Sequence, residues 1–364
     1  DARLLERKMT GIGRFLHTFL KELPLVDKTN KYFLFTYEPL KMVNDFYFNI
    51  PTGKSNIPQK IYSPYWSNII LPPYLKKYNI DLLFSVNQII PLAKPAGIKY
   101  IPMIHDVIYL IDKSFHPAIY RKYLDLLVRF SIKSADLIIT VSEHSKRDIL
   151  KFYKTNENKI KVVYLAAEKE FVPMSLTENE IAEIKTKIGC SGPFVLYLGM
   201  IENRKNISGI LKIADKITQK NPNVTFLLIG KIGFGGERLL EEVKKRKNVI
   251  YLKDINDDFL KKLYNISSVF LFPSLYEGFG FPPLEAMQSG LPVLSANNSS
   301  LREIVGDGGI LHDAYDIDAY VHDILRLVDD KEFFQNVRQK GFKQAAKFNM
   351  TSTTKEIVKI FNSI

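Results

Sequence analysis

Two glutamates that flank a glycine-rich segment are the residues whose type and spacing point most directly to chemistry. Glu277 and Glu285 enclose residues 278–283, which read Gly-Phe-Gly-Phe-Pro-Pro and lie between an expected strand and an expected helix. Glycines let backbone N–H groups approach a ligand closely, and a helix N-terminus favours a phosphate or sugar oxygen. Each carboxylate can accept two hydroxyl groups, so the pair suits a polyol. Alternatively, Glu285 stabilises only its own helix and Glu277 is a surface residue.

Two adjacent cations, Arg204 and Lys205, follow an apolar run that ends at Gly199. A guanidinium that binds two oxygens at once and a neighbouring ammonium can together neutralise a diphosphate. A leaving diphosphate gains charge as its bond to a sugar breaks, so fixed cations at this point would lower the barrier. The alternative is a charged loop that is simply solvated.

The first half of the chain has a histidine, His105, at the end of an expected strand, with Asp106 beside it. The carboxylate would hold the imidazole in one tautomer, although a lone histidine is more often structural. Gly11 and Gly13 predict a tight loop whose amides close over a phosphate, followed by a helix that begins with the cation Arg14. The third glycine of a dinucleotide fingerprint is absent, so a plain turn is equally consistent.

Short apolar runs alternate with amphipathic stretches along the whole chain, which predicts a mostly parallel sheet covered by helices, an α/β fold. The expected strands are 32–37, 82–86, 100–104, 137–141, 160–164, 194–198, 224–229, 249–252, 269–272 and 292–295. The expected helices are 14–23, 120–133, one after Ser142, one from Thr177, 208–218, 236–246, 258–266, 283–289, 299–305, 317–327 and 351–364. Two doubly wound units joined near residue 170 follow from this pattern. Ligands bind beyond the carboxyl ends of such strands, here in the cleft between the units.

The composition is that of a folded globular protein. The 364 residues are 25% charged and 46% hydrophobic, which suits two domains of ordinary size. The single cysteine, Cys190, excludes an internal disulfide and favours a reducing compartment. No apolar stretch reaches the ~20 residues of a transmembrane helix, and no signal peptide is evident. The first residues, Asp1 onward, lack a strand before the glycine loop, so we expect a strand of a few residues to precede them.

Positive charge is concentrated in the first half. The net charge of +12 divides into 26 Lys and Arg against 16 Asp and Glu (+10) in residues 1–170, and 25 against 23 (+2) in the remainder. A basic half favours anionic partners such as nucleic acid, acidic lipid or phosphorylated substrates. The alternative is a lysine-rich proteome encoded by an AT-rich genome.

Six motifs occur in an order that resembles one enzyme family. They are Asp1-Ala2-Arg3 with 10–14 (Thr-Gly-Ile-Gly-Arg), 104–106 (Ile-His-Asp) with 115–117 (Phe-His-Pro), 140–146 (Thr-Val-Ser-Glu-His-Ser-Lys), 196–199 (Leu-Tyr-Leu-Gly), 202–206 (Glu-Asn-Arg-Lys-Asn) and the 277–285 segment. The chain thereby resembles retaining glycosyltransferases of family 4, and more weakly the bacterial mannosyltransferases of surface-polysaccharide and O-antigen synthesis. The resemblance implies the GT-B fold, in which two Rossmann-like domains face a central cleft.

This resemblance also implies a domain arrangement and residue roles. Residues 1–170 would bind the acceptor, residues 171–348 the nucleotide sugar, and 349–364 would form a helix that returns to the first domain. The implied catalytic residues are His105, Arg204, Lys205 and Glu277. The implied donor-binding residues are Gly11, Gly13, Gly199, Lys231, Gly278, Phe279, Gly280, Phe281, Leu284 and Glu285. The acceptor side would include Arg14, Asp106 and Tyr109.

The implied activity is a retaining transfer of a hexose, with mannose favoured, from a nucleoside diphosphate sugar, with GDP-mannose favoured over a UDP-sugar. The acceptor would be a glycan or lipid-linked saccharide. One alternative is a sugar-phosphate synthase on the same fold, whereas a phosphorylase would need a pyridoxal-phosphate lysine and a longer chain. A basic nucleic-acid-binding protein is another alternative, but no zinc-finger or RNA-recognition signature supports it, so we expect no nucleic-acid partner.

A bound metal or cofactor is not expected. Asp316 and Asp318 have the Asp-any-Asp spacing of metal-dependent glycosyltransferases, but they precede an expected helix, which Asp316 would cap. No His and Cys cluster has zinc spacing. Arg204 and Lys205 would replace a metal at the diphosphate.

Two aromatic segments suggest where the protein acts. Residues 62–66 (Tyr-Ser-Pro-Tyr-Trp) and 74–78 (Tyr-Leu-Lys-Lys-Tyr) mix aromatic side chains with two lysines. That mixture suits an anionic membrane surface or a lipid-linked saccharide, and equally a core with a solvated rim. We therefore expect a cytoplasmic protein with peripheral contact at the inner face of the membrane.

Overall fold

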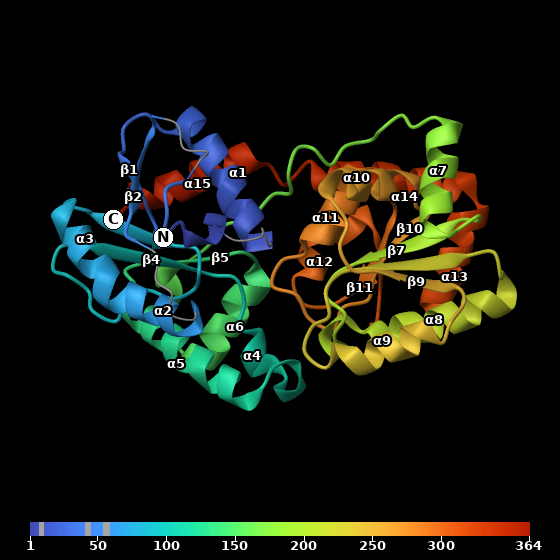
Figure 1. Ribbon diagram of the computed structural model, residues 1–364, viewed down its shortest axis with the longest axis horizontal. Helices are drawn as coiled ribbons and strands as arrows, with labels where there is room; N and C mark the ends of the chain where they lie inside the picture. Colours follow the sequence, from blue (N-terminus) through green and yellow to red (C-terminus); the bar gives the residue numbers. More distant parts are fainter. Residues whose placement is uncertain (7–10, 41–44, 54–58) are drawn as a thin grey trace. The chain divides into compact units, whose positions relative to one another are not determined.

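Parallel strands alternate with helices along the chain, as the apolar periodicity predicted (Figure 1). The computed structural model describes residues 1–6, 11–40, 45–53 and 59–364. The chain divides into two units. Unit 1 comprises Asp1–Ile111, Pro117–Ala166 and Asn349–Ile364, and unit 2 comprises Asp112–His116 and Ala167–Phe348. Among the residues described, no helix is long and apolar enough to cross a bilayer.

The described residues of unit 1 form two parallel sheets. The larger has the order β3-β4-β5-β6 and the smaller pairs β1 with β2. The strands are β1 (Tyr32–Thr36), β2 (Tyr47–Pro51), β3 (Leu82–Ser85), β4 (Lys99–Ile104), β5 (Ile138–Thr140) and β6 (Ile160–Val162). The α-helices are α1 (Gly11–Val26), α2 (Gln59–Tyr65), α3 (Leu71–Lys77), α4 (Ile108–Ile111), α5 (Ala118–Ser134), α6 (Glu143–Tyr153) and α15 (Met350–Phe361). Shorter helical turns are η1 (Arg3–Glu6), η2 (Trp66–Ile70) and η4 (Glu157–Lys159).

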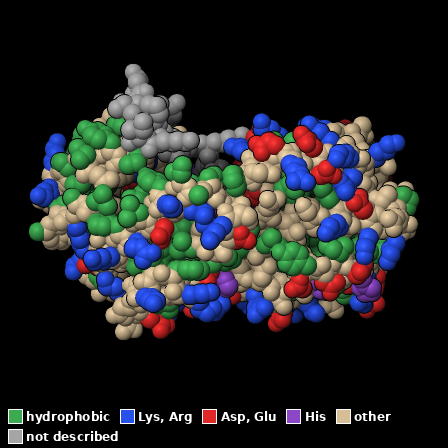
Figure 2. All heavy atoms as spheres, turned by 90° about the horizontal axis from the view of Figure 1, so that it is seen from below, with side chains coloured by type: hydrophobic (Ala, Val, Ile, Leu, Met, Phe, Trp, Pro, Cys, Tyr) green, Lys and Arg blue, Asp and Glu red, His purple; other side chains and the backbone are tan. Residues whose placement is uncertain are grey.

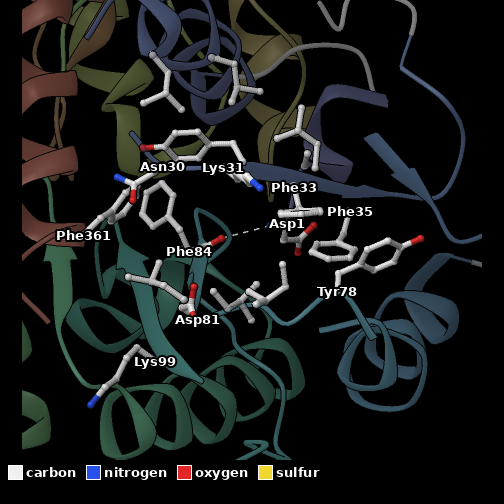
Figure 3. Close-up of a pocket in the computed structure, with 18 of the residues that line it drawn as sticks. Asp1, Asn30, Lys31, Phe33, Phe35, Tyr78, Asp81, Phe84, Lys99 and Phe361 are labelled. Carbon is white, nitrogen blue, oxygen red and sulfur yellow. Dashed lines mark hydrogen bonds between the residues drawn. The ribbon is translucent and has the colours of Figure 1, made fainter. Parts of the chain in front are cut away.

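The first two residues connect the two sheets of unit 1. The Asp1 ammonium donates to Phe84 O in β3, at 3.2 Å, and the Ala2 amide donates to Phe35 O in β1, at 3.0 Å. A largely apolar cavity of about 870 Å³ lies beside them, lined by α1, β1, β3 and the end of α15 (Figure 3). It contains none of the residues predicted to act on a donor. The expected strand before Asp1 stays a prediction.

The C-terminal helix packs on unit 1, as the resemblance to GT-B enzymes implied. Helix α15 lies beside α1, where the Thr351 hydroxyl donates to Glu22 Oε2 at 2.7 Å. Phe361 packs edge-on against Phe84 with ring centroids 5.2 Å apart. The expected start of the helix was wrong, because Asn349 caps it by accepting the amides of Thr351 and Ser352.

Unit 2 contains one parallel sheet of six strands in the order β12-β11-β10-β7-β8-β9. The strands are β7 (Phe194–Leu198), β8 (Thr225–Ile229), β9 (Val249–Leu252), β10 (Val269–Phe272), β11 (Val293–Ala296) and β12 (Ile310–His312). The α-helices are α7 (Glu178–Ile188), α8 (Ile207–Lys220), α9 (Gly236–Lys244), α10 (Asp257–Ile266), α11 (Phe281–Gln288), α12 (Leu301–Ile304), α13 (Ile317–Asp329) and α14 (Lys331–Ala345). Short turns are η3 (Lys113–Phe115), η5 (Asn203–Lys205) and η6 (Gly306–Gly308). The strands β7 and β10 are almost completely buried, which explains their continuous apolar runs.

Candidate donor-binding site

Three neighbouring strands of unit 2 end at the same edge of the sheet and carry the candidate site. The order β11-β10-β7 makes them adjacent, and all three run parallel. The turn η5 follows β7, the glycine-rich loop follows β10, and residues 298–300 follow β11. Because the carboxyl ends of parallel strands meet at one edge, segments up to about 100 residues apart in the sequence come into contact. Backbone bonding joins two of them, since the Leu275 amide donates to Arg204 O at 2.8 Å.

A buried cluster of charges forms where these segments meet. The Lys205 ammonium contacts Glu277 Oε1 at 2.5 Å, and the Arg204 guanidinium contacts Glu277 Oε2 at 3.0 Å. Each oxygen of the Glu277 carboxylate therefore has its own cation. The Ser274 hydroxyl adds a hydrogen bond to Oε1 at 2.6 Å. The structure thus brings together the three residues predicted at the diphosphate and the donor sugar.

The electrostatic environment keeps Glu277 ionised. Burial on its own would raise the pKa of this carboxyl, but the charges of Lys205 and Arg204 outweigh burial and hold the pKa below its usual value. Burial, and then the neighbouring Arg204 charge, lowers the pKa of Lys205. The side chains of Arg204, Lys205 and Glu277 are 15%, 8% and 11% exposed, so little water screens their interaction.

Glu202 is a fourth member of the cluster that the sequence reasoning did not single out. Its Oε1 lies 2.6 Å from the second terminal nitrogen of Arg204, so the guanidinium bridges two carboxylates. A Cβ on Gly233 would lie only 2.5 Å from Glu202 Oε2. The glycine therefore leaves the space that the Glu202 carboxylate occupies. The pattern Glu-x-Arg was visible in the sequence, but nothing in it indicated the contact with Gly233.

The loop of Glu277 is held in place by three consecutive polar residues after β11. The side-chain amide of Asn298 donates to Ser274 O at 3.0 Å, and Ser299 Oγ accepts the backbone amide of Glu277 at 3.0 Å. The Ser300 hydroxyl lies 2.9 Å from Glu277 O and 2.5 Å from Phe279 O. Ser299 itself has φ +44°, a left-handed conformation that is uncommon for serine. These three residues were missed, although the polar run Asn-Asn-Ser-Ser directly after an apolar strand was a usable signal.

Glu285 lies in helix α11 and is oriented by a tyrosine that the sequence did not single out. The Tyr264 hydroxyl in α10 donates to Glu285 Oε2 at 2.9 Å. Both residues are buried, and the Tyr264 ring packs edge-on against Phe171. The turn before α11 requires a glycine at position 280, because Gly280 has a φ of +128°, which glycine adopts easily and other residues adopt only with strain.

The remaining residues predicted to bind the donor differ in their burial and in their contacts. Gly278 lies in the loop, and the Phe279 ring packs against Phe281 with centroids 5.1 Å apart. Lys231 is exposed after β8. The amide of Gly199 donates to Ile229 O, which ties it into the sheet. The side chain of Leu284 is completely buried, and its amide donates to Gly280 O. This side chain therefore belongs to the core of unit 2, and a role at the donor stays a prediction.

In unit 1, His105 is held by a backbone carbonyl. Its Nε2 lies 2.9 Å from Val86 O, which can only accept, so Nε2 carries the proton. Burial lowers the pKa of His105, which favours the neutral ring. The expected role of Asp106 is corrected, because its carboxylate accepts the amide of Ile108 while Val86 sets the tautomer. The Ser145 hydroxyl donates to His105 O at 2.9 Å and so connects α6 to the end of β4.

Three other predictions concern residues of unit 1. Tyr109 is 1% exposed and its hydroxyl lies 2.7 Å from that of Tyr153, so the ring belongs to the core, and its expected place on the acceptor side stays a prediction. Gly11 and Gly13 lie in the first turn of α1, so the expected loop is helical there. Arg14 lies in the same turn and is partly buried.

Asp316 and Asp318 have separate structural contacts at the start of helix α13. Asp316 caps α13 by accepting the Ala319 amide at 3.1 Å, as the sequence predicted. Asp318 contacts Lys216 on the surface. Within the described part of the chain, no three His, Cys, Asp or Glu side chains form a group that could hold a metal ion.

Both halves of the chain match known protein families. Residues 9–170 match Glycosyltransferase Family 4, and residues 178–344 match Glycosyl transferases group 1. O-antigen chain mannosyltransferase B of Escherichia coli is 31% identical over 261 residues, which are 71% of this chain and 68% of that protein. The serotype-specific mannosyltransferase WbdA of Escherichia coli is 28% identical over 70% of this chain, but the match spans only 32% of WbdA.

Solved structures of similar fold cover nearly the full chain. WaaG, a glycosyltransferase involved in lipopolysaccharide biosynthesis, has a TM-score of 0.75 at 16% identity, with 98% of both chains covered. Anabaena Alr3699/HepE in complex with UDP and glucose has a TM-score of 0.74 at 16% identity, with 98% of this chain and 97% of that chain covered. These likenesses establish the GT-B fold. The relative that is 31% identical over two thirds of its length, together with the two family matches, shows that this chain belongs to glycosyltransferase family 4.

Proposed function

We propose that this glycosyltransferase moves a hexose from a nucleoside diphosphate sugar to a glycan or lipid-linked acceptor, with retention of configuration and without a metal. The observation that carries the proposal is the cluster of Arg204, Lys205 and Glu277 at the carboxyl edge of the unit 2 sheet. Two cations next to a carboxylate can bind a diphosphate and a sugar hydroxyl side by side.

Each residue has a defined role in this proposal. Arg204 and Lys205 bind the diphosphate, and Glu277 with the amides of residues 279–281 binds the hexose. Glu285 accepts the ribose hydroxyls. The acceptor oxygen bonds to C1 of the sugar on the face from which the diphosphate leaves. The C1–O bond to the diphosphate breaks, and the acceptor proton passes to the departing phosphate oxygen, so no covalent nucleophile is needed. The cations stabilise the charge that develops on that phosphate.

The favoured donor is GDP-mannose and the favoured product belongs to a surface polysaccharide. Support comes from the two relatives in Escherichia coli, which are both mannosyltransferases, one of them of the O-antigen chain. A UDP-sugar is the competing donor, because HepE has the same fold and was solved with UDP and glucose. The basic first half, at +10, suits a phosphorylated acceptor on the cytoplasmic side of the membrane.

Transfer with GDP-mannose and with UDP-glucose tests the proposal directly. A crude lipid-linked saccharide fraction serves as acceptor, NMR of the product reports the anomeric configuration, and EDTA is added in a parallel reaction. We expect transfer from GDP-mannose with retention, unchanged by EDTA. Transfer from UDP-glucose alone would overturn the choice of donor, and inversion or loss with EDTA would overturn the mechanism.

A matched pair of variants tests the residue roles. Glu277→Gln keeps the size of the side chain and removes the charge between the two cations. We expect it to lower kcat/KM by at least tenfold, since a charged hydrogen bond is worth about 1.5–3 kcal/mol. Asp318→Asn removes a carboxylate that pairs with a lysine on the surface and should leave the rate unchanged. Equal rates for wild type and Glu277→Gln would contradict the assignment.

A further inference from the structure

The buried cluster after β7 contains as many carboxylates as cations. Arg204 and Lys205 are its cations, and Glu277 and Glu202 are its carboxylates, so the formal charge of the four side chains is zero. These side chains are between 8% and 15% exposed, which leaves little water to screen the charges. A site for a diphosphate needs a surplus of positive charge. Glu202 therefore opposes the anion that Arg204 receives in the proposed function.

The terminal nitrogens of Arg204 show where this opposition acts. Nη1 donates to Tyr276 O at 2.9 Å and contacts Glu277 Oε2 at 3.0 Å, so both of its N–H groups have partners within the loop of Glu277. Nη2 contacts Glu202 Oε1 at 2.6 Å. Because Nη1 is fully engaged, a phosphate oxygen that binds a terminal nitrogen of Arg204 without disrupting the loop has to bind Nη2. At that nitrogen the phosphate competes with Glu202.

The loop after β8 holds Glu202 in place. Residues 230–236 include four glycines, and the Gly233 amide donates to Ile201 O, next to Glu202, at 2.9 Å. A Cβ on Gly236 would lie only 2.0 Å from Ile201 O, so this close approach requires glycine. Gly233 in turn leaves the space that Glu202 Oε2 occupies. The carboxylate is therefore built into the fold of unit 2 and is not a surface charge that lies near Arg204 by accident.

We propose that Glu202 competes with the diphosphate for Nη2 of Arg204 and thereby promotes release of the nucleoside diphosphate product. In the empty site Glu202 contacts this nitrogen, and a bound diphosphate takes the place of the carboxylate. When the product leaves, Arg204 returns to Glu202, and the recovered contact offsets part of the cost of losing the phosphate. Glu202 acts only through Arg204, so it is a positioning residue. The inference rests on the proposed function, in which Arg204 binds the diphosphate.

Calorimetric titration with inorganic pyrophosphate and with GDP tests the competition. Glu202→Gln keeps the size of the side chain and removes its charge, so the competing contact with Arg204 becomes weaker. We expect both anions to bind about tenfold more tightly, because a hydrogen bond loses much of its strength when the charge of its acceptor is removed. Weaker or unchanged binding of pyrophosphate by Glu202→Gln would overturn the inference, since Glu202 would then only orient the guanidinium.

A second variant and a matched control locate the effect. Glu202→Asp keeps the charge but shortens the reach towards Nη2, so we expect pyrophosphate to bind about threefold more tightly than to the wild type. On the surface of unit 2, Lys and Arg side chains are interspersed with Asp and Glu (Figure 2). Glu242 forms a surface pair, 2.6 Å from Lys245 Nζ and 42% exposed. Glu242→Gln should bind pyrophosphate as the wild type does, and equal tightening by this variant would overturn the assignment to Glu202.

Turnover separates this role from a loss of geometry and from a failure of the proposed function. Rapid mixing of Glu202→Gln with GDP-mannose and the acceptor fraction should give a burst of product, a lower kcat and a lower KM for the donor, because release of GDP becomes rate-limiting. A lower kcat with a higher KM and no burst would overturn the inference. Pyrophosphate binding that tightens in Glu202→Gln, while GDP binds neither protein, would count against the proposed donor and support the inference. A wild type that binds GDP and transfers the hexose, without tightening in Glu202→Gln, would overturn the inference alone.

Discussion

Replacing Lys205 with methionine is the most informative perturbation of the charge cluster around Glu277. Methionine keeps the length and the apolar stem of lysine but removes the ammonium that contacts Glu277 Oε1 at 2.5 Å. The two side chains are only 8% and 11% exposed. The Glu277 carboxylate therefore loses one of two cations without gaining access to water.

The expected cost follows from this burial. Removing one partner of a buried ion pair costs about 3–5 kcal/mol, because the other charge stays buried and incompletely compensated. Glu277 keeps the Arg204 guanidinium at 3.0 Å and the Ser274 hydroxyl at 2.6 Å. We therefore expect the lower end, about 3 kcal/mol of free energy of unfolding. Adding Glu277→Gln to this variant should cost less than the sum of the two single changes, by about 1–3 kcal/mol.

Hydrogen exchange followed by mass spectrometry is the appropriate assay, since a chain of two units need not unfold in one step. Peptides from β7 and β10 report the opening of unit 2. Fluorescence of Trp66, the single tryptophan, reports unit 1 and serves as an internal control. Lys216→Met is the matched variant, because Lys216 contacts Asp318 at the same 2.5 Å but on the surface. It should change little, as exposed pairs do.

Two results would refute the reasoning. Equal protection of β7 and β10 in Lys205→Met and Lys216→Met would mean that burial adds nothing to the Lys205 contact. Strictly additive effects in the double variant with Glu277→Gln would mean that the two side chains are not coupled.

Three further predictions concern the same site. Tyr264→Phe removes the hydroxyl that donates to Glu285 and should lower GDP affinity about tenfold, because a hydrogen bond to a charged group is worth about 1.5–3 kcal/mol. Unchanged GDP affinity in calorimetry would contradict this prediction. Gly233→Ala places a Cβ 2.5 Å from Glu202 Oε2 and should cost about 1–3 kcal/mol in a denaturant titration; wild-type stability would show that Glu202 moves freely. Because burial and Arg204 lower the pKa of Lys205, GDP affinity should be constant near neutrality and fall on the alkaline side before the usual lysine value of about 10.4. Calorimetry across pH checks this, and a fall only at the usual value would contradict it.

Sequence periodicity was sufficient to predict the architecture of both units. The run at 194–198 is buried on both faces of the sheet, so it is continuously apolar and easily recognised. The strand β2 was missed because Tyr47–Pro51 contains asparagine and exposed Phe48, a mixture without a clear period. The helix α14 was missed because Lys331–Ala345 has few apolar residues to mark a buried face and includes Gly341, a residue that is unfavourable inside a helix.

The residue types of the candidate site were predictable, but their pairing was not. Lys205 and Glu277 are 72 residues apart, and the sequence suggested separate ligands for them. Only the adjacency of β7 and β10 in the sheet places both side chains in one cluster. The burial of Leu284 and Tyr109 was not predictable either, because a family motif does not show which of its members point into the core.

Calorimetric titration of GDP into the wild type and into Arg204→Ala is the measurement that tests the central claim most directly. Arg204 bridges Glu202 and Glu277, and in the proposed function it binds the diphosphate. We predict one site per chain in the wild type and at least tenfold weaker binding in the variant, since a bidentate charged contact is lost. Equal affinity of the two proteins for GDP would contradict the claim that this cluster receives the nucleotide donor.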